Sequence, residues 1–151
     1  MKPEENLKKF NINLPNAPDP VGSYVASKIV GNFIYISGQV SFNNHGKLIK
    51  GKIGKELSLE QGQDAAKFCA LNILAQLKKK CGSLDKVKGC VKLTGYVNST
   101  DSFIDQPKII NGASNLISDI FGDAGKHARA AISVNSLPLG AAVEVDAIFE
   151  L

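Results

Sequence analysis

The C-terminal segment KHARAAISVNSLPLGAAVEVDAIFEL, residues 126–151, predicts two β-strands joined by a turn at Pro138 and Gly140. It holds the only arginine of the chain, Arg129, whereas the other 17 of the 18 basic residues are lysines. A guanidinium offers a flat pair of donors that matches a carboxylate or a phosphate, which an ammonium group does not. Strand alternation places Arg129 beside small neighbours such as Ala131, so the sequence predicts a small anion pocket here.

The second of these strands, residues 143–150, alternates apolar residues on one face with mainly acidic residues on the other. We expect the two strands to pair antiparallel, which would place Glu144 near Arg129 on the same face of the sheet. Such a pair is either part of a ligand site or a structural cross-strand ion pair. The pattern alone leaves both interpretations open.

Length and composition indicate one ordinary globular domain. The chain has 151 residues, of which 44% are hydrophobic and 21% charged. We assign residues 1–151 to this domain, with residues 1–14 as an N-terminal arm, and expect an extended course up to residue 21. No apolar run is long enough to cross a membrane and the start does not resemble a signal peptide, so we expect a cytoplasmic protein.

The net charge of +4 raises the question of a nucleic-acid partner. The lysines are dispersed, and the densest group, residues 78–80, lies where a helix is expected to end and where cations favour the helix dipole. This distribution argues against a nucleic-acid groove. The three cysteines have no CxxC spacing, which predicts neither a disulfide framework nor a zinc site.

The first half of the chain predicts β-strands at residues 24–30 and 33–37, joined by a tight turn at residues 31–32. A third strand is expected at residues 40–42. Gly38 lies between the second and third strands, and a glycine in a strand pattern indicates either a bulge or a place where a ligand approaches the backbone.

Two helices are expected in the remainder of the chain. The first opens at the capping box of residues 58–61 and ends at Gly82, and the second begins near Pro107 and ends at Gly122. A long strand over residues 87–97 separates them. This order predicts an α+β fold, a six-stranded and mostly antiparallel sheet with two helices on one face. The uncovered sheet face would then be buried against copies of the chain, which predicts a homo-oligomer.

Three stretches resemble the signature sequences of the Rid (YjgF-like) family: GNFIYISGQ at residues 31–39, HARA at 127–130, and LP followed by VEVDAI at 137–148. The resemblance implies a chorismate-mutase-like fold of the bacillus type and homotrimers with a site in each intersubunit cleft. It also implies hydrolysis of reactive 2-imino and 2-enamino acids to 2-oxo acids and ammonia, a form of metabolite damage control.

The resemblance also implies roles for individual residues. Arg129 would hold the carboxylate of the imino acid, and Glu144 would position the attacking water. The other residues implied at the cleft are Tyr24, Ser37, Gly38, Asn111 and Ala131. Such a reaction needs no metal and no cofactor, because an iminium carbon is already electrophilic. Ala131 replaces a cysteine of the archetype and residues 139–141 replace a charged segment, so the sequence is similar to a divergent branch often labelled endoribonuclease-like.

Two other functions remain open. An endoribonuclease or translation inhibitor would need paired histidines, or a histidine with a lysine, yet His45 is expected at an exposed turn and only His127 lies near the motif. A non-catalytic protein would bind small carboxylates without turnover. A chorismate mutase normally holds its dicarboxylate with more than one arginine, and this chain has one.

Overall fold

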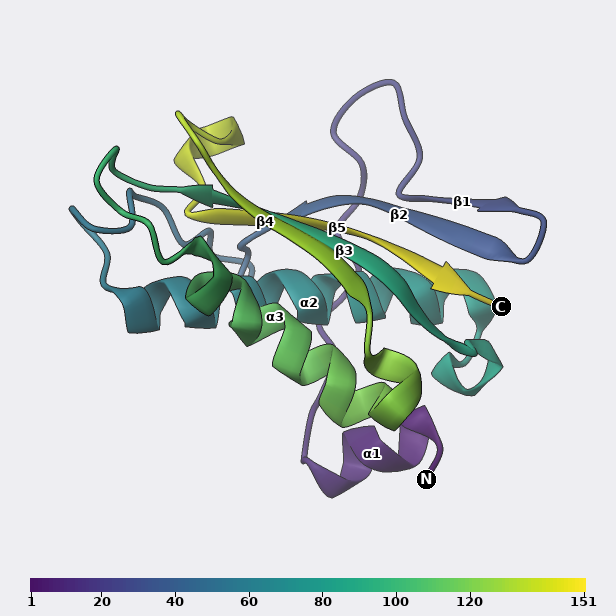
Figure 1. Cartoon of the computed structure of the whole chain (residues 1–151). Coiled ribbons are helices and arrows are strands. Elements are labelled where there is room, and N and C mark those ends of the chain that lie inside the picture. The colour runs from purple at the N-terminus through teal and green to yellow at the C-terminus, as the bar shows by residue number, and fades with distance from the viewer.

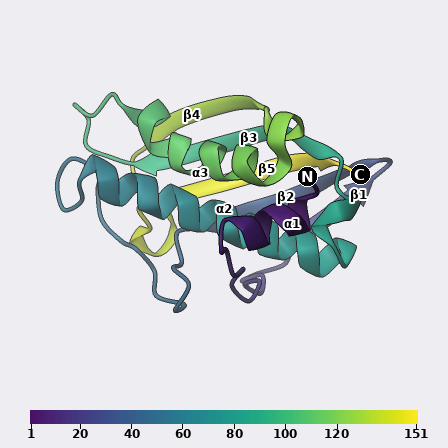
Figure 2. The same cartoon turned by 90° about the horizontal axis from the view of Figure 1, so that it is seen from below.

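A computed structural model describes all residues, 1–151, and shows a five-stranded sheet with its two long helices on one face (Figure 1). Its helices and strands are α1 Pro3–Lys9, β1 Ser27–Val30, β2 Phe33–Val40, α2 Leu59–Cys81, β3 Gly89–Asn98, α3 Gln106–Phe121, β4 Ala128–Val134 and β5 Val143–Glu150. Three short 3-10 helices connect them: η1 Leu84–Lys86, η2 Gly122–Gly125 and η3 Pro138–Gly140. Figure 2, seen from below, shows α2 and α3 side by side in front of the sheet. The predicted α+β class is confirmed, and no helix combines the length and apolarity that a membrane crossing requires.

The two long helices form where the local signals place them. Ser58 accepts a hydrogen bond from the Gln61 amide at 3.2 Å, and the Gln61 side chain accepts one from the Ser58 amide at 2.8 Å. This reciprocal cap satisfies amides that have no partner inside the helix. Gly82 ends α2 in a left-handed conformation (φ 82°), and Gly122 follows α3. The buried faces of both helices join one cluster of 29 buried residues with the sheet.

The strand count is five, not the six that we predicted. The hairpin of β1 and β2 forms as expected, with Gly31 in the left-handed region (φ 59°) at its turn. The segment that we predicted as a third strand, residues 40–42, does not form one, because β2 continues without a break from Phe33 to Val40. Phe42 makes only an isolated bridge to Leu48. Gly38 therefore lies inside a strand, at a register shift, and not between two strands.

The C-terminal segment departs more from the prediction, because its two strands do not pair. The sheet order is β1-β2-β5-β3-β4, so β3 lies between β4 and β5. β4 pairs parallel with β3, and the crossover that a parallel pair requires is supplied by α3. The connection from β4 to β5 crosses the end of β3, where the Asn98 amide donates to the Ala142 carbonyl at 2.9 Å. The turn at Pro138 and Gly140 therefore does not join two paired strands, and it leads the chain across the end of β3 instead.

A bulge in β3 changes which residues of this strand are buried. The register against β5 shifts between Cys90 and Lys92, and Val91 is left 39% exposed. Beyond the bulge, Leu93 and Val97 are fully buried beneath the helices. Leu93 therefore belongs to the core and not to the outer sheet face.

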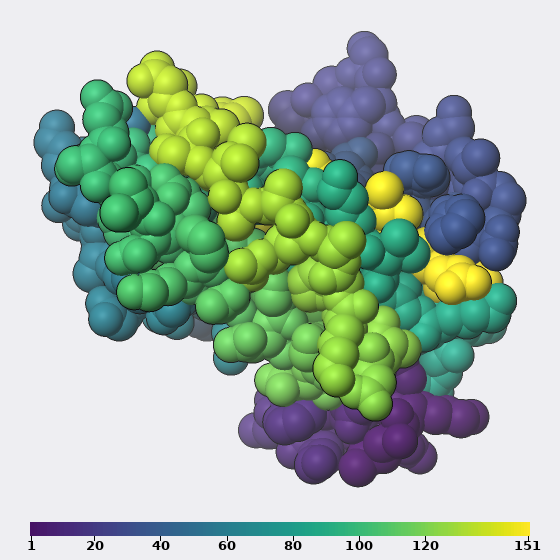
Figure 3. All heavy atoms as spheres, in the orientation of Figure 1, coloured from purple at the N-terminus to yellow at the C-terminus, as the bar shows by residue number.

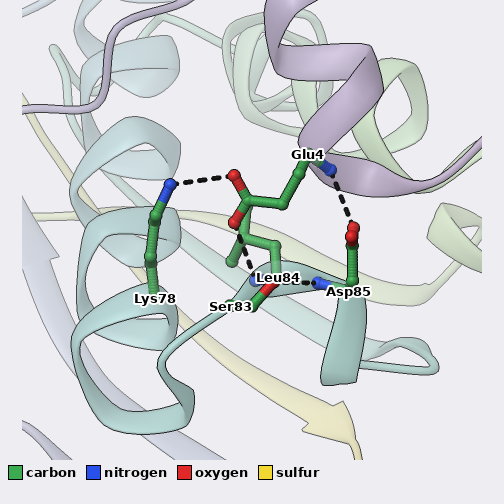
Figure 4. Close-up of polar contacts among 5 residues, drawn as sticks. All are labelled: Glu4, Lys78, Ser83, Leu84 and Asp85. Atoms are coloured by element: carbon green, nitrogen blue, oxygen red, sulfur yellow. Dashed lines mark hydrogen bonds and ion pairs between the residues drawn. The ribbon is translucent and has the colours of Figure 1, made fainter.

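The N-terminus forms a helix where the sequence predicted extended chain. The buried Leu7 of α1 joins the core, and the Asn6 side chain donates to the Ile120 carbonyl at 2.8 Å. Glu4 accepts from the Lys78 ammonium at 2.8 Å and from the Leu84 amide at 3.0 Å, which ties α1 to the end of α2 (Figure 4). Seven residues are too few for a clear hydrophobic period, so this helix depends on its tertiary contacts.

The outer face of the sheet carries no helix. Several apolar side chains that point away from the helices are at least one-third exposed, namely Val30 (55%), Phe33 (38%), Tyr35 (45%) and Ile132 (48%). The residues that alternate with them along the strands point to the helices and, like Ile34 and Leu93, are fully buried. An uncovered apolar sheet face of this kind is typical of a surface that contacts another protein chain.

Candidate active site

The predicted site residues fall into two clusters. Tyr24, Gly38 and Glu144 line a cavity of about 400 Å³, which we call the carboxylate cleft. Its walls come from the segment of residues 18–26 on one side and from η3 on the other. Figure 3 shows the surface hollowed between these two projecting segments. The cleft opens on the outer face of the sheet, because Glu144 points away from the helices.

The glycine at position 38 makes room for the Glu144 carboxyl group. A Cβ atom at this position would lie 2.9 Å from the Glu144 Cδ atom and 3.0 Å from Oε1, closer than non-bonded carbon atoms approach. The predicted bulge at Gly38 is confirmed by the register shift between Ile36 and Gln39, and the group that approaches the backbone there is the Glu144 carboxyl group. The approach of a ligand to Gly38 stays a prediction. Ser37 serves a different purpose, since its hydroxyl donates to the Val25 carbonyl at 2.7 Å and so holds the wall of the cleft against β2.

The Glu144 carboxyl group is half-buried at the base of the cleft. Burial, and after it the negative charge of Asp146, raise the pKa of Glu144 above its ordinary value. Asp146 points to the same face two residues along β5 and accepts a hydrogen bond from the Tyr96 hydroxyl at 2.9 Å. Burial and this bond raise the pKa of Tyr96 to about 12. The surroundings thus favour a carboxyl group that can both take up and release a proton.

The second cluster, the guanidinium cluster, surrounds Arg129 on the edge strand β4. The Nη1 atom donates to Asn111 Oδ1 at 2.7 Å and to Ser114 Oγ at 3.1 Å, and Nη2 donates to the Pro107 carbonyl at 3.4 Å. All three acceptors belong to α3. The Nε atom has no hydrogen-bond partner within the chain, and Nη2 keeps one hydrogen free. The edge of the guanidinium formed by Nε and Nη2 is therefore available to a carboxylate.

His127 extends this cluster by one more residue. Its Nδ1 atom lies 2.6 Å from the Gly125 carbonyl and its Nε2 atom 2.9 Å from Ser114 Oγ. A carbonyl oxygen only accepts, so we assign the proton to Nδ1, which leaves Nε2 of the neutral ring to accept from the Ser114 hydroxyl. The sequence analysis considered His127 only for a ribonuclease, and it missed that His127 and Ser114 hold Arg129. Their positions outside the apolar stripe of α3 and beside the arginine were the available signals.

The two clusters do not meet within one chain. Arg129 is aligned with Leu93 and Ala147, three residues from Glu144, so the two backbones are about 10 Å apart across the sheet and about 10 Å along it. Arg129 points to the helix side and Glu144 to the outer face. The prediction that both side chains lie together on one face was wrong, because it assumed that β4 and β5 pair. Ala131 lies on the same face as Arg129 and packs against the core.

Fold and site together define a small α+β protein that presents a guanidinium and a carboxylate at separate places on one sheet. The family model described as "YjgF/chorismate mutase-like, putative endoribonuclease" matches residues 4–151. The chain belongs to this family, which confirms the resemblance found in its motifs.

Three comparisons show the range of names within the family. Protein TCP17 of Trypanosoma cruzi is 45% identical over 147 residues, which are 97% of this chain and 92% of that protein. A crystal structure from Shewanella oneidensis, which carries the same endoribonuclease description, has a TM-score of 0.96 at 35% identity and covers 100% of both chains. The human 2-iminobutanoate/2-iminopropanoate deaminase is 29% identical over 141 residues, 91% of this chain and 86% of its own length. The family therefore contains members named for two different activities.

Proposed function

We propose that this protein hydrolyses 2-imino acids to 2-oxo acids and ammonia. The observation that carries the proposal is the pair of clusters: a guanidinium with a free edge for a carboxylate, and a half-buried carboxyl group with a raised pKa at the base of a cleft. The relation to proteins named 2-iminobutanoate/2-iminopropanoate deaminases supports the same chemistry. Tyr24 and Gly38 shape the cleft, and Asn111 holds the arginine.

The site would be completed between two copies of the chain, with the guanidinium cluster of one facing the carboxylate cleft of the next. Arg129 lies on an edge strand, and the outer sheet face next to Glu144 is apolar and uncovered. A contact between two different surfaces is heterologous, and it closes into a ring when the rotation between copies allows. The family resemblance supports a homotrimer as the form of that ring.

In the proposed reaction, Arg129 binds the carboxylate of the iminium form of the substrate through Nε and Nη2. Glu144 takes a proton from water as the water oxygen bonds to C2, and the C=N electron pair moves to nitrogen. The protonated Glu144 then delivers its proton to the nitrogen of the carbinolamine. The C–N bond breaks and ammonia leaves. As the C=O bond forms, the hydroxyl proton passes to the Glu144 carboxylate, which releases it to solvent. Water thus supplies the oxygen, and no electrons are exchanged with any other molecule.

The ribonuclease alternative finds less support in the geometry. His45 lies exposed on a turn, and both ring nitrogens of His127 have partners within the chain. Neither cluster therefore contains two histidines that could act together on a phosphodiester. The deaminase assay also separates turnover from simple carboxylate binding.

The proposal is tested by generating 2-imino acids in situ. An L-amino acid oxidase with catalase produces them, semicarbazide traps what remains, and the loss of semicarbazone measures hydrolysis by the added protein. We expect wild-type protein to lower the semicarbazone signal in proportion to its concentration and Glu144→Gln to lower it much less. Equal signals with and without wild-type protein would refute the deaminase proposal, and binding of 2-oxo acids without turnover would support the carboxylate-binding alternative.

The raised pKa of Glu144 leads to a prediction about pH. Glu144 must be ionised to accept the proton of water, so activity should fall as the pH falls through the pKa of this group. Asp146 contributes to raising that pKa, so Asp146→Asn should lower it and move the acidic limb of the kcat/KM profile to lower pH. The asparagine can still accept from Tyr96. Asp119→Asn removes the same charge from the exposed side of α3 and should leave the limb in place; a shift to higher pH in Asp146→Asn would contradict the assignment.

A further inference from the structure

The apolar lining and the volume of the carboxylate cleft indicate which substrate side chains would fit it. Above Glu144 the cavity is bounded mainly by apolar groups, to which Val21, Val40, Phe42 and Leu139 contribute. Its volume of about 400 Å³ is within the usual range for sites that enclose a small organic molecule. An imino acid with a side chain of one or two carbons would leave most of these walls without contact, and unfilled apolar space forfeits dispersion and burial energy.

Charge in the cleft excludes one class of side chain. The charged residues on its wall, Asp19 and Glu144, are both acidic, and no lysine, arginine or histidine lines it. Asp19 faces the Lys79 ammonium at 3.6 Å and is 91% exposed, so it is largely solvated. The Arg129 that faces the cleft from the neighbouring copy is already occupied by the substrate carboxylate. An acidic side chain would therefore enter a half-buried region that holds a carboxylate and whose own lining offers no cation, which costs free energy.

Leu139 supplies an independent observation. It adopts a left-handed conformation (φ 61°), which is uncommon for a residue other than glycine, asparagine or aspartate, and its side chain is 69% exposed at the mouth of the cleft. Neither backbone energy nor burial within the chain accounts for a leucine here. Local strain that is maintained without a gain in packing is typical of ligand-binding positions.

We propose that the carboxylate cleft binds the side chain of the substrate and selects 2-imino acids with large apolar side chains, such as those formed from leucine, methionine and phenylalanine. This inference rests on the proposed deaminase function. Leu139 closes over the apolar side chain, while Arg129 of the neighbouring copy holds the carboxylate. The reaction that supplies such substrates is the oxidation or dehydrogenation of an apolar amino acid at its α-carbon.

The experiment compares kcat/KM across 2-imino acids generated in situ from leucine, methionine, phenylalanine, alanine and glutamate. We expect the first three to exceed alanine by at least about tenfold. Methionine and glutamate form a matched pair of similar length, and the methionine derivative should also exceed the glutamate derivative by at least about tenfold. Comparable or faster turnover of the alanine derivative, or equal turnover of the glutamate and methionine derivatives, would overturn the inference.

A variant locates the effect in the cleft. Leu139→Asn has a similar size and tolerates the left-handed backbone, so it should fold and should reduce the ratio of leucine-derived to alanine-derived kcat/KM several-fold. Ile104→Asn makes the same kind of change at an exposed residue outside the cleft and should leave the ratio unchanged. An unchanged ratio in Leu139→Asn would show that this residue does not select the side chain.

Measuring the binding of 2-oxo acids distinguishes an error about side-chain selection from an error about the deaminase function. If no imino acid is hydrolysed, the deaminase proposal is wrong, and the affinities of the 2-oxo acids still test the cleft. Calorimetry should then give a lower Kd for 4-methyl-2-oxopentanoate than for pyruvate, and the weakest binding for 2-oxoglutarate. The reverse order would overturn the selection of apolar side chains whatever the activity.

A second and independent observation concerns the hydrogen-bonded chain behind Arg129. The Gly125 carbonyl, His127, Ser114 and Arg129 form successive contacts of 2.6, 2.9 and 3.1 Å. Each acceptor in this chain receives from a defined donor, so the ring of His127 fixes the rotation of the Ser114 hydroxyl, which presents its lone pairs to Nη1. We infer that His127 and Ser114 are positioning residues that keep the Nε and Nη2 edge of Arg129 turned toward the ligand.

A double-mutant cycle on carboxylate binding tests this role. With wild-type Arg129, His127→Ala should raise the Kd of a bound 2-oxo acid about tenfold, and in the Arg129→Lys background the same change should have almost no effect. His45→Ala, at the exposed turn, should change neither Kd. An equal effect of His127→Ala in both backgrounds would reduce its role to general stability of η2 and α3. Because the readout is binding, the result does not depend on turnover.

Discussion

Arg129→Lys is expected to lower kcat/KM for 2-imino acids about 100-fold, chiefly by raising KM. Lysine keeps the positive charge but replaces a two-pronged donor by a single point, and it cannot hold the contacts to Asn111 and Ser114 while also presenting an edge to the substrate. A loss of this size corresponds to about 3 kcal/mol, which matches one bidentate charge-assisted contact that becomes monodentate.

Steady-state kinetics with the in situ assay measure this effect, and circular dichroism establishes that the variant folds. Lys126→Arg changes an exposed cation of the same segment and serves as the matched control, since its ammonium contacts only Asp123. Full activity of Arg129→Lys on the best substrate would show that the arginine does not hold the carboxylate. A loss of kcat alone would assign it to the chemical step and not to binding.

The second large effect is that mixing two inactive variants, Arg129→Ala and Glu144→Gln, should restore activity. Arg129→Ala removes the guanidinium and Glu144→Gln removes the carboxylate, so each variant should be almost inactive alone. If the site combines Arg129 of one copy with Glu144 of the next, random mixed rings contain some interfaces with both native groups. For equal amounts of the two variants, roughly a quarter of the sites should be native, so activity should rise to about that fraction of wild type.

The mixing experiment requires exchange of subunits, which differently tagged variants make measurable by native mass spectrometry. Each variant mixed with itself is the control. Mixed oligomers without activity would show that both groups act within one chain or that one of them is not needed. A site contained in a single chain cannot be restored by mixing, because every chain would lack one group.

Much of the local structure could be predicted because its causes are local. The capping box at Ser58, the glycine after each long helix and the turn at Gly31 each follow from the conformational preferences of a few neighbouring residues. The alternation within β5 was likewise predicted, since the apolar set that includes Val145 is buried and Glu144 lies on the opposite face. These predictions needed no knowledge of which strands lie side by side.

Strand pairing was predicted less well, because it depends on contacts between residues far apart in the chain. A short connection with a proline and a glycine favours a hairpin, yet residues 135–142 pass over the end of β3 instead. The alternation in β4 is compatible with pairing to β3 or to β5, and only the assembly of the whole sheet decides between these two partners. For the same reason the sequence brought Arg129 and Glu144 together on one face, although their chemical roles were inferred independently of that error.

The place of β5 in the sheet also determines the order in which the chain can complete its fold. β5 is the last strand along the chain but the middle strand of the sheet, where it pairs with both β2 and β3. During synthesis on the ribosome, the β1–β2 hairpin and the β3–α3–β4 unit are finished first and have no strand to join them. Their inner edges and apolar faces stay open until the residues of β5 emerge, so the partly made chain is exposed to aggregation until this strand has been synthesised.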